Sequence, residues 1–235
     1  MELKTYSDNL ARFGFWKTAH TVLHAAINKL IFFKTLQGMT LTMQSLDDEY
    51  LKLDPRFESR FLSSDELLAY VKDESFDMDE HFIKSAIARK DTCFGIIESG
   101  QLVSYGWYST IPTPMSDDLQ LYFDENWTYM YKGYTKPSHR GLRLHALGMA
   151  LAVEAFAAKG AKGLISYVET YNYRSLRSCE RMGYRNFGKI YIARLFGKYR
   201  IYSQKECTPY GFTVRELPSG DVHTPTSAYP EKQGP

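Results

Sequence analysis

The residues best suited to chemistry lie between positions 134 and 145, where an aromatic run changes into a basic turn. The segment reads Tyr134-Thr135-Lys136-Pro137-Ser138-His139-Arg140-Gly141-Leu142-Arg143-Leu144-His145. A helix that begins here would expose unpaired backbone N–H groups and a partial positive charge at its first turn. A phosphate group can bind such a helix start, and Arg140 or Arg143 can add charge-assisted hydrogen bonds. The segment therefore predicts an anion site; the alternative is a basic helix start without a ligand.

A second group of polar residues lies between positions 169 and 184. It contains Glu169, Tyr171, Asn172, Tyr173, Ser175, Cys179 and the run Glu180-Arg181-Met182-Gly183-Tyr184. A carboxylate such as Glu169 can accept a proton, although a solvated surface position is the other interpretation. A thiol such as Cys179 can donate one, but a buried cysteine more often packs as a small core residue. This segment supplies the acid and base candidates.

Both groups need strands and helices to position them, and residues 39–206 have the required alternation. We expect strands at 39–44, 92–98, 101–109, 127–135, 163–168, 184–195 and 199–205, and helices at 64–71, 79–90, 142–159 and 173–182. Ser64 and Asp79 suit helix N-caps, and Ser99-Gly100 suits a hairpin turn. Gly160 and Gly183 suit helix ends. The pattern predicts a mixed α/β domain.

The two ends of the chain differ from this central part. Residues 13–36 have a helical period, with Trp16, Leu23, Ile27, Leu30 and Phe33 mostly three to four apart, so residues 1–38 are predicted to be a helical extension. We expect its apolar stripe to pack on the domain, and contact with a membrane surface is the alternative. His20 and His24 have metal-ligand spacing, but no third ligand is nearby, so no metal is expected. Residues 207–235 predict a poorly ordered tail.

Composition excludes several classes of protein. The 235 residues, 44% hydrophobic and 24% charged, suit one domain with appendages. The three cysteines, Cys93, Cys179 and Cys207, are few and far apart, which argues against a disulfide framework. No apolar run approaches the roughly 20 residues of a membrane span, and the N-terminus does not resemble a signal peptide. A cytoplasmic location is therefore expected.

Charge is distributed unevenly along the chain. Acidic residues dominate 45–80, whereas 127–206 carries fifteen Lys and Arg against Glu154, Glu169, Glu180 and Glu206. The basic half should attract an anion such as a cofactor phosphate, although a solvated basic surface is equally compatible. Nucleic acid is not expected as a partner, because no helix-turn-helix, zinc-finger or RNP-type pattern accompanies the charge.

Together, the two polar segments resemble the GNAT family of acyl-coenzyme A dependent N-acyltransferases. The first is similar to the family's strand, Pro-containing turn and Arg/Gln-x-x-Gly-x-Gly/Ala loop before a long helix. The second, with Asn172 to Ser175 and then Gly183-Tyr184, is similar to the Asn-x-x-Ser/Ala helix that ends in Gly-Phe/Tyr. The resemblance covers residues 39–206. The chain departs from the pattern at Arg143 and His145, which replace Gly and Gly/Ala.

This resemblance implies a largely antiparallel central sheet with helices on both faces, and a binding site for acetyl-CoA or another acyl-CoA as co-substrate. The implied donor-binding residues are Tyr134, Thr135, Arg140, Gly141, Leu142, Arg143, Leu144, His145, Asn172 and Ser175. The strand with Gly133 would separate from its neighbour after Val168, and backbone N–H groups near Tyr134 and Thr135 would polarise the thioester carbonyl. Gly133 would then mark a bulge, a close backbone approach or a simple bend.

The implied reaction is direct attack of a small primary amine on the thioester. Glu169 is the candidate proton acceptor, and Cys179 stands where many relatives place a Tyr acid, with Tyr171 or Tyr173 as substitutes. A covalent acyl-Cys179 mechanism is disfavoured, because no adjacent histidine is evident. The acceptor is expected to be selected by loops such as 111–126. The alternatives are acyl carrier protein as donor, or a non-catalytic module that binds an acyl thioester. The sequence does not determine the oligomeric state.

Overall fold

The computed structural model describes residues 10–71, 73 and 76–217. Its helices are α2 (Phe15–Leu30), α3 (Ser64–Tyr70), α4 (Glu80–Ala88), α5 (Leu144–Ala157) and α6 (Tyr173–Met182), with short 3-10 helices η1 (Asp48–Leu51), η2 (Pro137–His139) and η3 (Lys205–Tyr210). Its strands are β1 (Phe32–Leu41), β2 (Phe57–Phe61), β3 (Thr92–Glu98), β4 (Gln101–Ser109), β5 (Thr113–Pro114), β6 (Leu119–Tyr122), β7 (Trp127–Thr135), β8 (Gly163–Glu169), β9 (Arg185–Leu195), β10 (Lys198–Ser203) and β11 (Thr213–Glu216). None of these described helices is both long and apolar enough to cross a bilayer.

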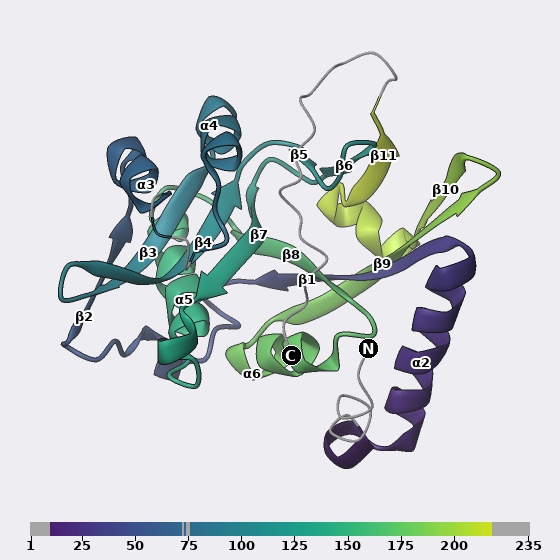
Figure 1. The fold of residues 1–235 in the computed structure, drawn as a ribbon, viewed down its shortest axis with the longest axis horizontal. Coiled ribbons are helices and arrows are strands. Elements are labelled where there is room, and N and C mark those ends of the chain that lie inside the picture. The colour runs from purple at the N-terminus through teal and green to yellow at the C-terminus, as the bar shows by residue number, and fades with distance from the viewer. Residues whose placement is uncertain (1–9, 72, 74–75, 218–235) are drawn as a thin grey trace.

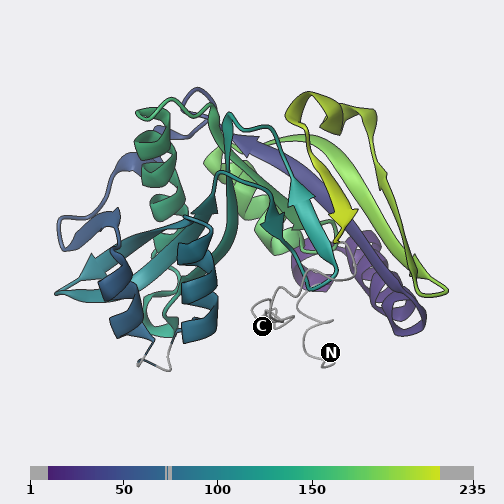
Figure 2. The same ribbon diagram turned by 90° about the horizontal axis from the view of Figure 1, so that it is seen from above.

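A large sheet in the order β10-β9-β1-β8-β7-β4-β3-β2 organises the molecule (Figure 1). All neighbouring strands are antiparallel except β7 and β8. Helices α3 and α4 cover one face of the β2–β4 region, and α5 covers the opposite face (Figure 2). A smaller sheet, β11-β6-β5, packs on the face of β1, β8 and β9 that carries Leu36, Ile165 and Ile190. The expected mixed α/β fold is confirmed.

Strand β1 corrects the predicted N-terminal boundary. The helix ends at Leu30 rather than continuing to residue 36, and β1 begins at Phe32 rather than at residue 39. β1 lies between β8 and β9 and pairs with both, so the predicted division after residue 38 falls inside a central strand. Its residues from Thr35 onward are largely buried. Contacts distant in sequence therefore override the helical period of residues 31–36.

The predicted C-terminal tail was also placed too early. Residues 207–217 belong to the fold, because Cys207 and Phe212 lie in the core and β11 pairs with β6. Strands β2, β5, β6 and β11 were not predicted. Residues 218–235 of the predicted tail lie outside the described residues.

Helix α2 packs on the domain with a different face from the one predicted. Thr21 and His24 are buried against the domain, and the Nδ2 of Asn28 donates a hydrogen bond to the His24 carbonyl oxygen at 3.0 Å. The apolar residues Trp16, Leu23 and Leu30 are exposed. The prediction that the apolar stripe packs on the domain is wrong: the polar stripe takes that place.

Candidate functional site

The only parallel pair in the large sheet separates soon after it forms. Residues Trp127–Tyr129 pair with Gly163–Ile165, and beyond them β7 follows β4 while β8 follows β1. The separation begins earlier than Val168, where the sequence placed it. Ser166, just past the last pair, donates from its hydroxyl to the Met130 carbonyl oxygen at 3.3 Å. The two strands therefore diverge near the middle of the sheet.

A β-bulge accompanies the divergence. Trp107 pairs with Lys132 but Tyr108 pairs with Met130, so Tyr131 is the extra residue in β7. The bulge thus lies two positions before Gly133, which was one candidate for marking it.

Beyond the bulge, the ladder fixes the direction of the backbone N–H groups. The Lys136 N–H donates to the Val103 carbonyl oxygen at 2.9 Å. Because antiparallel ladder bonds alternate, the N–H groups of Gly133 and Thr135 point away from β4, toward the side that β8 has left. The Tyr134 carbonyl oxygen and the Thr135 hydroxyl are both 2.9 Å from the Ser104 hydroxyl. Of the two residues predicted to polarise a carbonyl, Thr135 has the suitable N–H direction and Tyr134 faces β4.

The turn after β7 leads directly into the N-terminus of α5. It passes through η2, Arg140 and Gly141, and Arg143 is the N-cap of α5 in the left-handed conformation, with φ 59°. A glycine, the residue of the family pattern at this position, would adopt this φ without strain, whereas arginine adopts it at a cost. The side chains of Arg140 and Arg143 are exposed and form no ion pair with any residue in the described ranges. The following N–H groups of Leu144 and His145 belong to the first helical turn.

His145 lies against Gly133. A Cβ atom at Gly133 would collide with the tip of the His145 imidazole, so a larger residue here would require that ring to move. His145 is partly exposed as a residue, yet burial of its imidazole lowers the pKa of His145 to about 4. The ring is therefore neutral near pH 7. Gly133 serves neither as the bulge nor as a simple bend, but as the space for a side chain of α5.

Helix α6 begins and ends as its sequence predicts. The Asn172 side chain accepts a hydrogen bond from the Ser175 N–H at 3.1 Å, and Gly183 ends the helix in a left-handed conformation. Cys179 packs against the core cluster that includes Met182 and Tyr184. Burial, with a smaller contribution from Glu180, raises the pKa of the Cys179 thiol to about 12. The thiol therefore stays protonated and is a weak acid.

The remaining predicted residues have partners in the N-terminal part of the chain. Glu169 accepts a hydrogen bond from Lys34 Nζ at 3.2 Å. The Tyr173 hydroxyl is 2.9 Å from His20 Nδ1, and burial raises the pKa of Tyr173. The Tyr171 ring lies against the His24 ring, with the centroids 4.2 Å apart and the planes tilted by 36°. Tyr173 thus faces α2, and Glu169 is held by an ion pair with β1.

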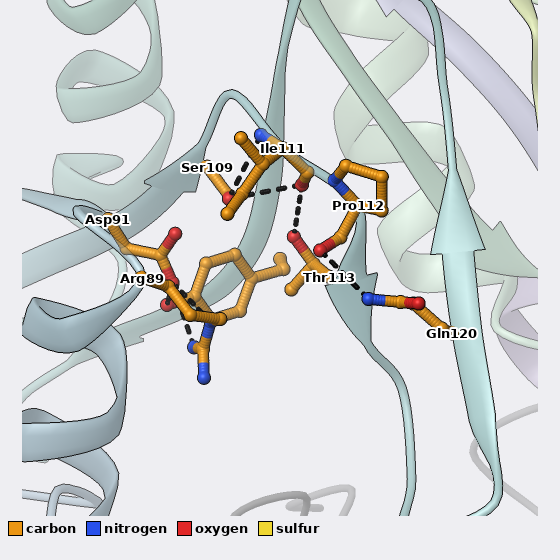
Figure 3. A network of polar contacts seen from close by, with 8 residues as sticks. Arg89, Asp91, Ser109, Ile111, Pro112, Thr113 and Gln120 are labelled. Atoms are coloured by element: carbon orange, nitrogen blue, oxygen red, sulfur yellow. Dashed lines mark hydrogen bonds and ion pairs between the residues drawn. The ribbon is translucent and has the colours of Figure 1, made fainter. Parts of the chain in front are cut away.

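A buried carboxylate that the sequence did not single out lies beside the bulge (Figure 3). Asp91 Oδ2 accepts from Arg89 Nη2 at 2.8 Å and from the Tyr131 hydroxyl at 2.9 Å. The Asp91 side chain is fully buried, yet its Oδ1 has no hydrogen-bond partner among the described residues. Such an atom normally has a partner, so this oxygen marks a place where a buried water molecule could bind. No local sequence signal could have identified it, because the group depends on contacts between α4, β3 and β7.

The loop that leads from β4 to β5 lies next to this carboxylate (Figure 3). The hydroxyls of Ser109 and Thr113 both donate to the Ile111 carbonyl oxygen, at 3.2 and 2.8 Å. Gln120 Nε2 donates to the Pro112 carbonyl oxygen at 3.2 Å. These bonds fix the first part of the 111–126 region, which was expected to select the acceptor.

Comparison with known families gives one match. The model of the acetyltransferase (GNAT) family matches residues 59–184, which is more than half of the 235 residues. No curated protein matches the chain.

Several solved structures are similar at low sequence identity. A Drosophila protein is 16% identical, with 77% of this chain and 58% of that protein covered and a TM-score of 0.47. A GCN5-related N-acetyltransferase-like protein from Streptococcus suis is 16% identical, with 76% and 67% covered and a TM-score of 0.46. A GCN5-related N-acetyltransferase from Sphaerobacter thermophilus is 11% identical, with 82% and 55% covered and a TM-score of 0.48. This chain thus spans 55–67% of the length of these three proteins.

Proposed function

The chain belongs to the GNAT acetyltransferase family, and on that premise we propose that it transfers an acetyl or other acyl group from a coenzyme A thioester to a primary amine. The amine attacks the thioester directly, with both substrates bound at once. The observation that carries the proposal is the divergence of β7 from β8 after Tyr129 and Ile165. It leaves the N–H groups of Gly133 and Thr135 directed away from β4, where they can stabilise the oxyanion that forms on the thioester carbonyl.

The turn from β7 into α5 supports binding of the donor phosphates. The first turn of α5 supplies backbone N–H groups and the positive end of the helix dipole. The exposed guanidinium groups of Arg140 and Arg143 can add charge-assisted hydrogen bonds. The residues present therefore fit a pyrophosphate at this position. Asn172 caps the N-terminus of α6, so we expect it to affect donor binding only by positioning that helix.

Removal of the amine proton has two candidate acceptors. Glu169, the residue expected from the sequence, is already paired with Lys34 at 3.2 Å. Asp91 is also in an ion pair, with Arg89, and is bonded to Tyr131 at the bulge, but its second oxygen has no partner in the described part of the chain. We favour the Asp91–Tyr131 pair, acting through a water molecule because the Asp91 side chain is fully buried. If so, Asp91→Asn lowers kcat strongly, whereas Glu169→Gln changes it little.

Protonation of the departing thiolate is the second proton transfer. A thiol with a pKa of about 12 is a weaker acid than an ordinary thiol with a pKa near 8.5, so transfer from Cys179 is unfavourable. Tyr173 faces His20 rather than the diverging strands. We therefore expect solvent to supply this proton, and Cys179→Ala to change kcat by no more than about twofold.

Release of free thiol from acetyl-CoA in the presence of mixed primary amines tests the proposed function. The three cysteines of the chain are at least partly buried, and burial raises the pKa of each thiol, so a thiol reagent reports mainly the product. Amine-dependent thiol release supports the proposal. Release only from acyl carrier protein would make the carrier protein the donor. Binding of acyl-CoA without release at any amine concentration would leave a non-catalytic module.

A further inference from the structure

The outer face of α2 is apolar along its whole length. Phe15, Trp16, Leu23 and Leu30 are 66%, 83%, 59% and 87% exposed. The polar residues Thr21 and His24 face the domain instead. A helix in water normally has its apolar stripe buried, so an outward stripe of this kind indicates that something else covers it.

The apolar face continues beyond the helix. Phe32 pairs with Arg194, so Ile31 lies beside the turn that joins β9 to β10. This turn carries Leu195 and Phe196 near the C-terminal end of α2, and the Phe196 side chain is fully exposed. We call the outer side of α2, with Phe15, Trp16, Leu23 and Leu30, together with residues 31, 195 and 196 the apolar face. Figure 1 shows α2 and this hairpin at the same end of the molecule.

Four arginines lie beside the other end of α2. Arg12, Arg174, Arg177 and Arg181 line a hollow of about 430 Å³ together with Phe13 and Ser178. All four arginine residues are exposed, and none forms an ion pair within residues 10–71, 73 and 76–217. Phe13 joins the hollow to α6 through Tyr173, with ring centroids 5.9 Å apart. This arginine cluster is therefore a concentrated positive charge next to the apolar face.

We propose that the apolar face docks on an anionic membrane surface, with the arginine cluster binding lipid phosphate groups. Helices that lie in the membrane interface combine an apolar face containing Trp, Phe and Leu with nearby cations, as here. Aromatic residues occur near both ends of the face, where Trp and Phe suit the interfacial region. A second copy packed through the same face is less suitable, because it would bring four more arginines to that interface. The docking does not depend on the proposed acyl transfer.

Trp16 provides a direct readout of docking. The other two tryptophans, Trp107 and Trp127, are buried, so a change of solvent exposure should alter mainly the Trp16 emission. With phosphatidylcholine vesicles that contain phosphatidylserine, we expect a blue shift and sedimentation of the protein with the vesicles. With pure phosphatidylcholine, or at high salt, the bound fraction should fall several-fold, because the cluster contributes through screened charge.

Three variants separate the contributions. Leu23→Glu with Leu30→Glu should reduce the vesicle-bound fraction at least tenfold, whereas Met43→Glu, a matched change at an exposed apolar residue elsewhere, should not. Arg177→Ala with Arg181→Ala should remove the preference for phosphatidylserine and leave weak binding. Circular dichroism melting verifies that each variant is folded, and the wild-type Trp16 shift remains a test if the glutamate variant is not.

Other results would overturn the proposal. A blue-shifted Trp16 emission without vesicles, together with a dimer mass in solution, would assign the apolar face to a second copy. The same emission from a monomer would mean that another segment of the chain covers α2. No sedimentation of the wild type with anionic vesicles, or equal sedimentation of the double glutamate variant, would contradict docking through this face.

Discussion

Two side chains in the candidate donor site differ from the family pattern, and each is accommodated by a different local feature. Arg143 takes the left-handed conformation that a glycine would take more easily, which costs of the order of 1 kcal/mol. His145 occupies the space beside Gly133. Both residues change the lining of the site, since each places a larger side chain where the family pattern has a small one.

Arg140 should contribute to donor affinity without affecting the chemical step. If its guanidinium binds a phosphate of the donor, Arg140→Ala should weaken binding by about 1.5–3 kcal/mol, the usual range for a hydrogen bond to a charged group. Phosphate contacts are equal in the ground and transition states, so the donor KM should rise roughly 10- to 150-fold at nearly constant kcat. Steady-state kinetics measure this, with Arg215→Ala, an exposed arginine on β11, as the control. An unchanged donor KM in a folded Arg140→Ala protein would place the phosphate site elsewhere.

His145 should make the stability of the protein depend on pH. Its pKa is about 4 in the folded state and near 6.5 when unfolded, so between these values the unfolded state binds more protons. The free energy of unfolding should therefore fall as the pH falls from 6.5 to 4, by at most about 3 kcal/mol from this residue.

The difference between wild type and His145→Gln isolates this contribution. Urea unfolding at several pH values should show a difference that is constant above pH 7 and changes in favour of the variant below about 6.5. A difference that does not vary with pH would mean that the imidazole is already solvated.

Elements defined by local signals could be predicted from the sequence, and those defined by distant contacts could not. Strands β3, β4 and β7 and helix α6 have the predicted bounds, because Ser99-Gly100 forms the hairpin turn and Asn172 and Gly183 cap α6. Strand β1 was missed because its place between β8 and β9 depends on residues far along the chain.

The candidate site follows the same division. The donor loop and its arginines are contiguous in sequence and could be located from it. The bulge at Tyr131 and the buried Asp91 come together only through sheet pairing. The face of α2 that packs on the domain could not be predicted, because a helical period shows that two faces exist but not which of them contacts the domain.

The N-cap of α3 is Ser63 rather than the predicted Ser64, and this correction can be tested. The sequence favoured Ser64 as the cap, but the Ser63 hydroxyl accepts from the Glu66 N–H, and the Glu66 side chain accepts from the Ser63 N–H in return. Ser63→Ala should lower the free energy of unfolding by about 1 kcal/mol, and Ser64→Ala, one residue away, should have little effect. Urea denaturation of the two variants distinguishes them. An equal loss for both would show that the capping bond is not formed.

At the scale of the whole molecule, the large sheet consists of two parts with a narrow connection. One part contains β2, β3, β4 and β7, and the other contains β8, β1, β9 and β10. Only three residue pairs, from Trp127 with Gly163 to Tyr129 with Ile165, join β7 to β8. Helix α5 follows the first part and α6 follows the second. A donor bound between them would contact both parts, so its binding should affect the stability of the complete fold.

Coenzyme A should therefore raise the melting temperature of the intact chain. A ligand that binds only the folded state at 100 times its Kd stabilises it by about 2.7 kcal/mol. For a chain of this size, each kcal/mol corresponds to roughly 2–4 °C, so a shift of roughly 5–10 °C is expected at that ligand concentration. Differential scanning fluorimetry with increasing coenzyme A measures the shift, and inorganic pyrophosphate shows how much the phosphates contribute. In Arg140→Ala the same shift should require a higher coenzyme A concentration. No shift at millimolar coenzyme A, with thiol release still observed from a carrier-protein donor, would contradict the coenzyme A assignment and leave acyl transfer itself standing.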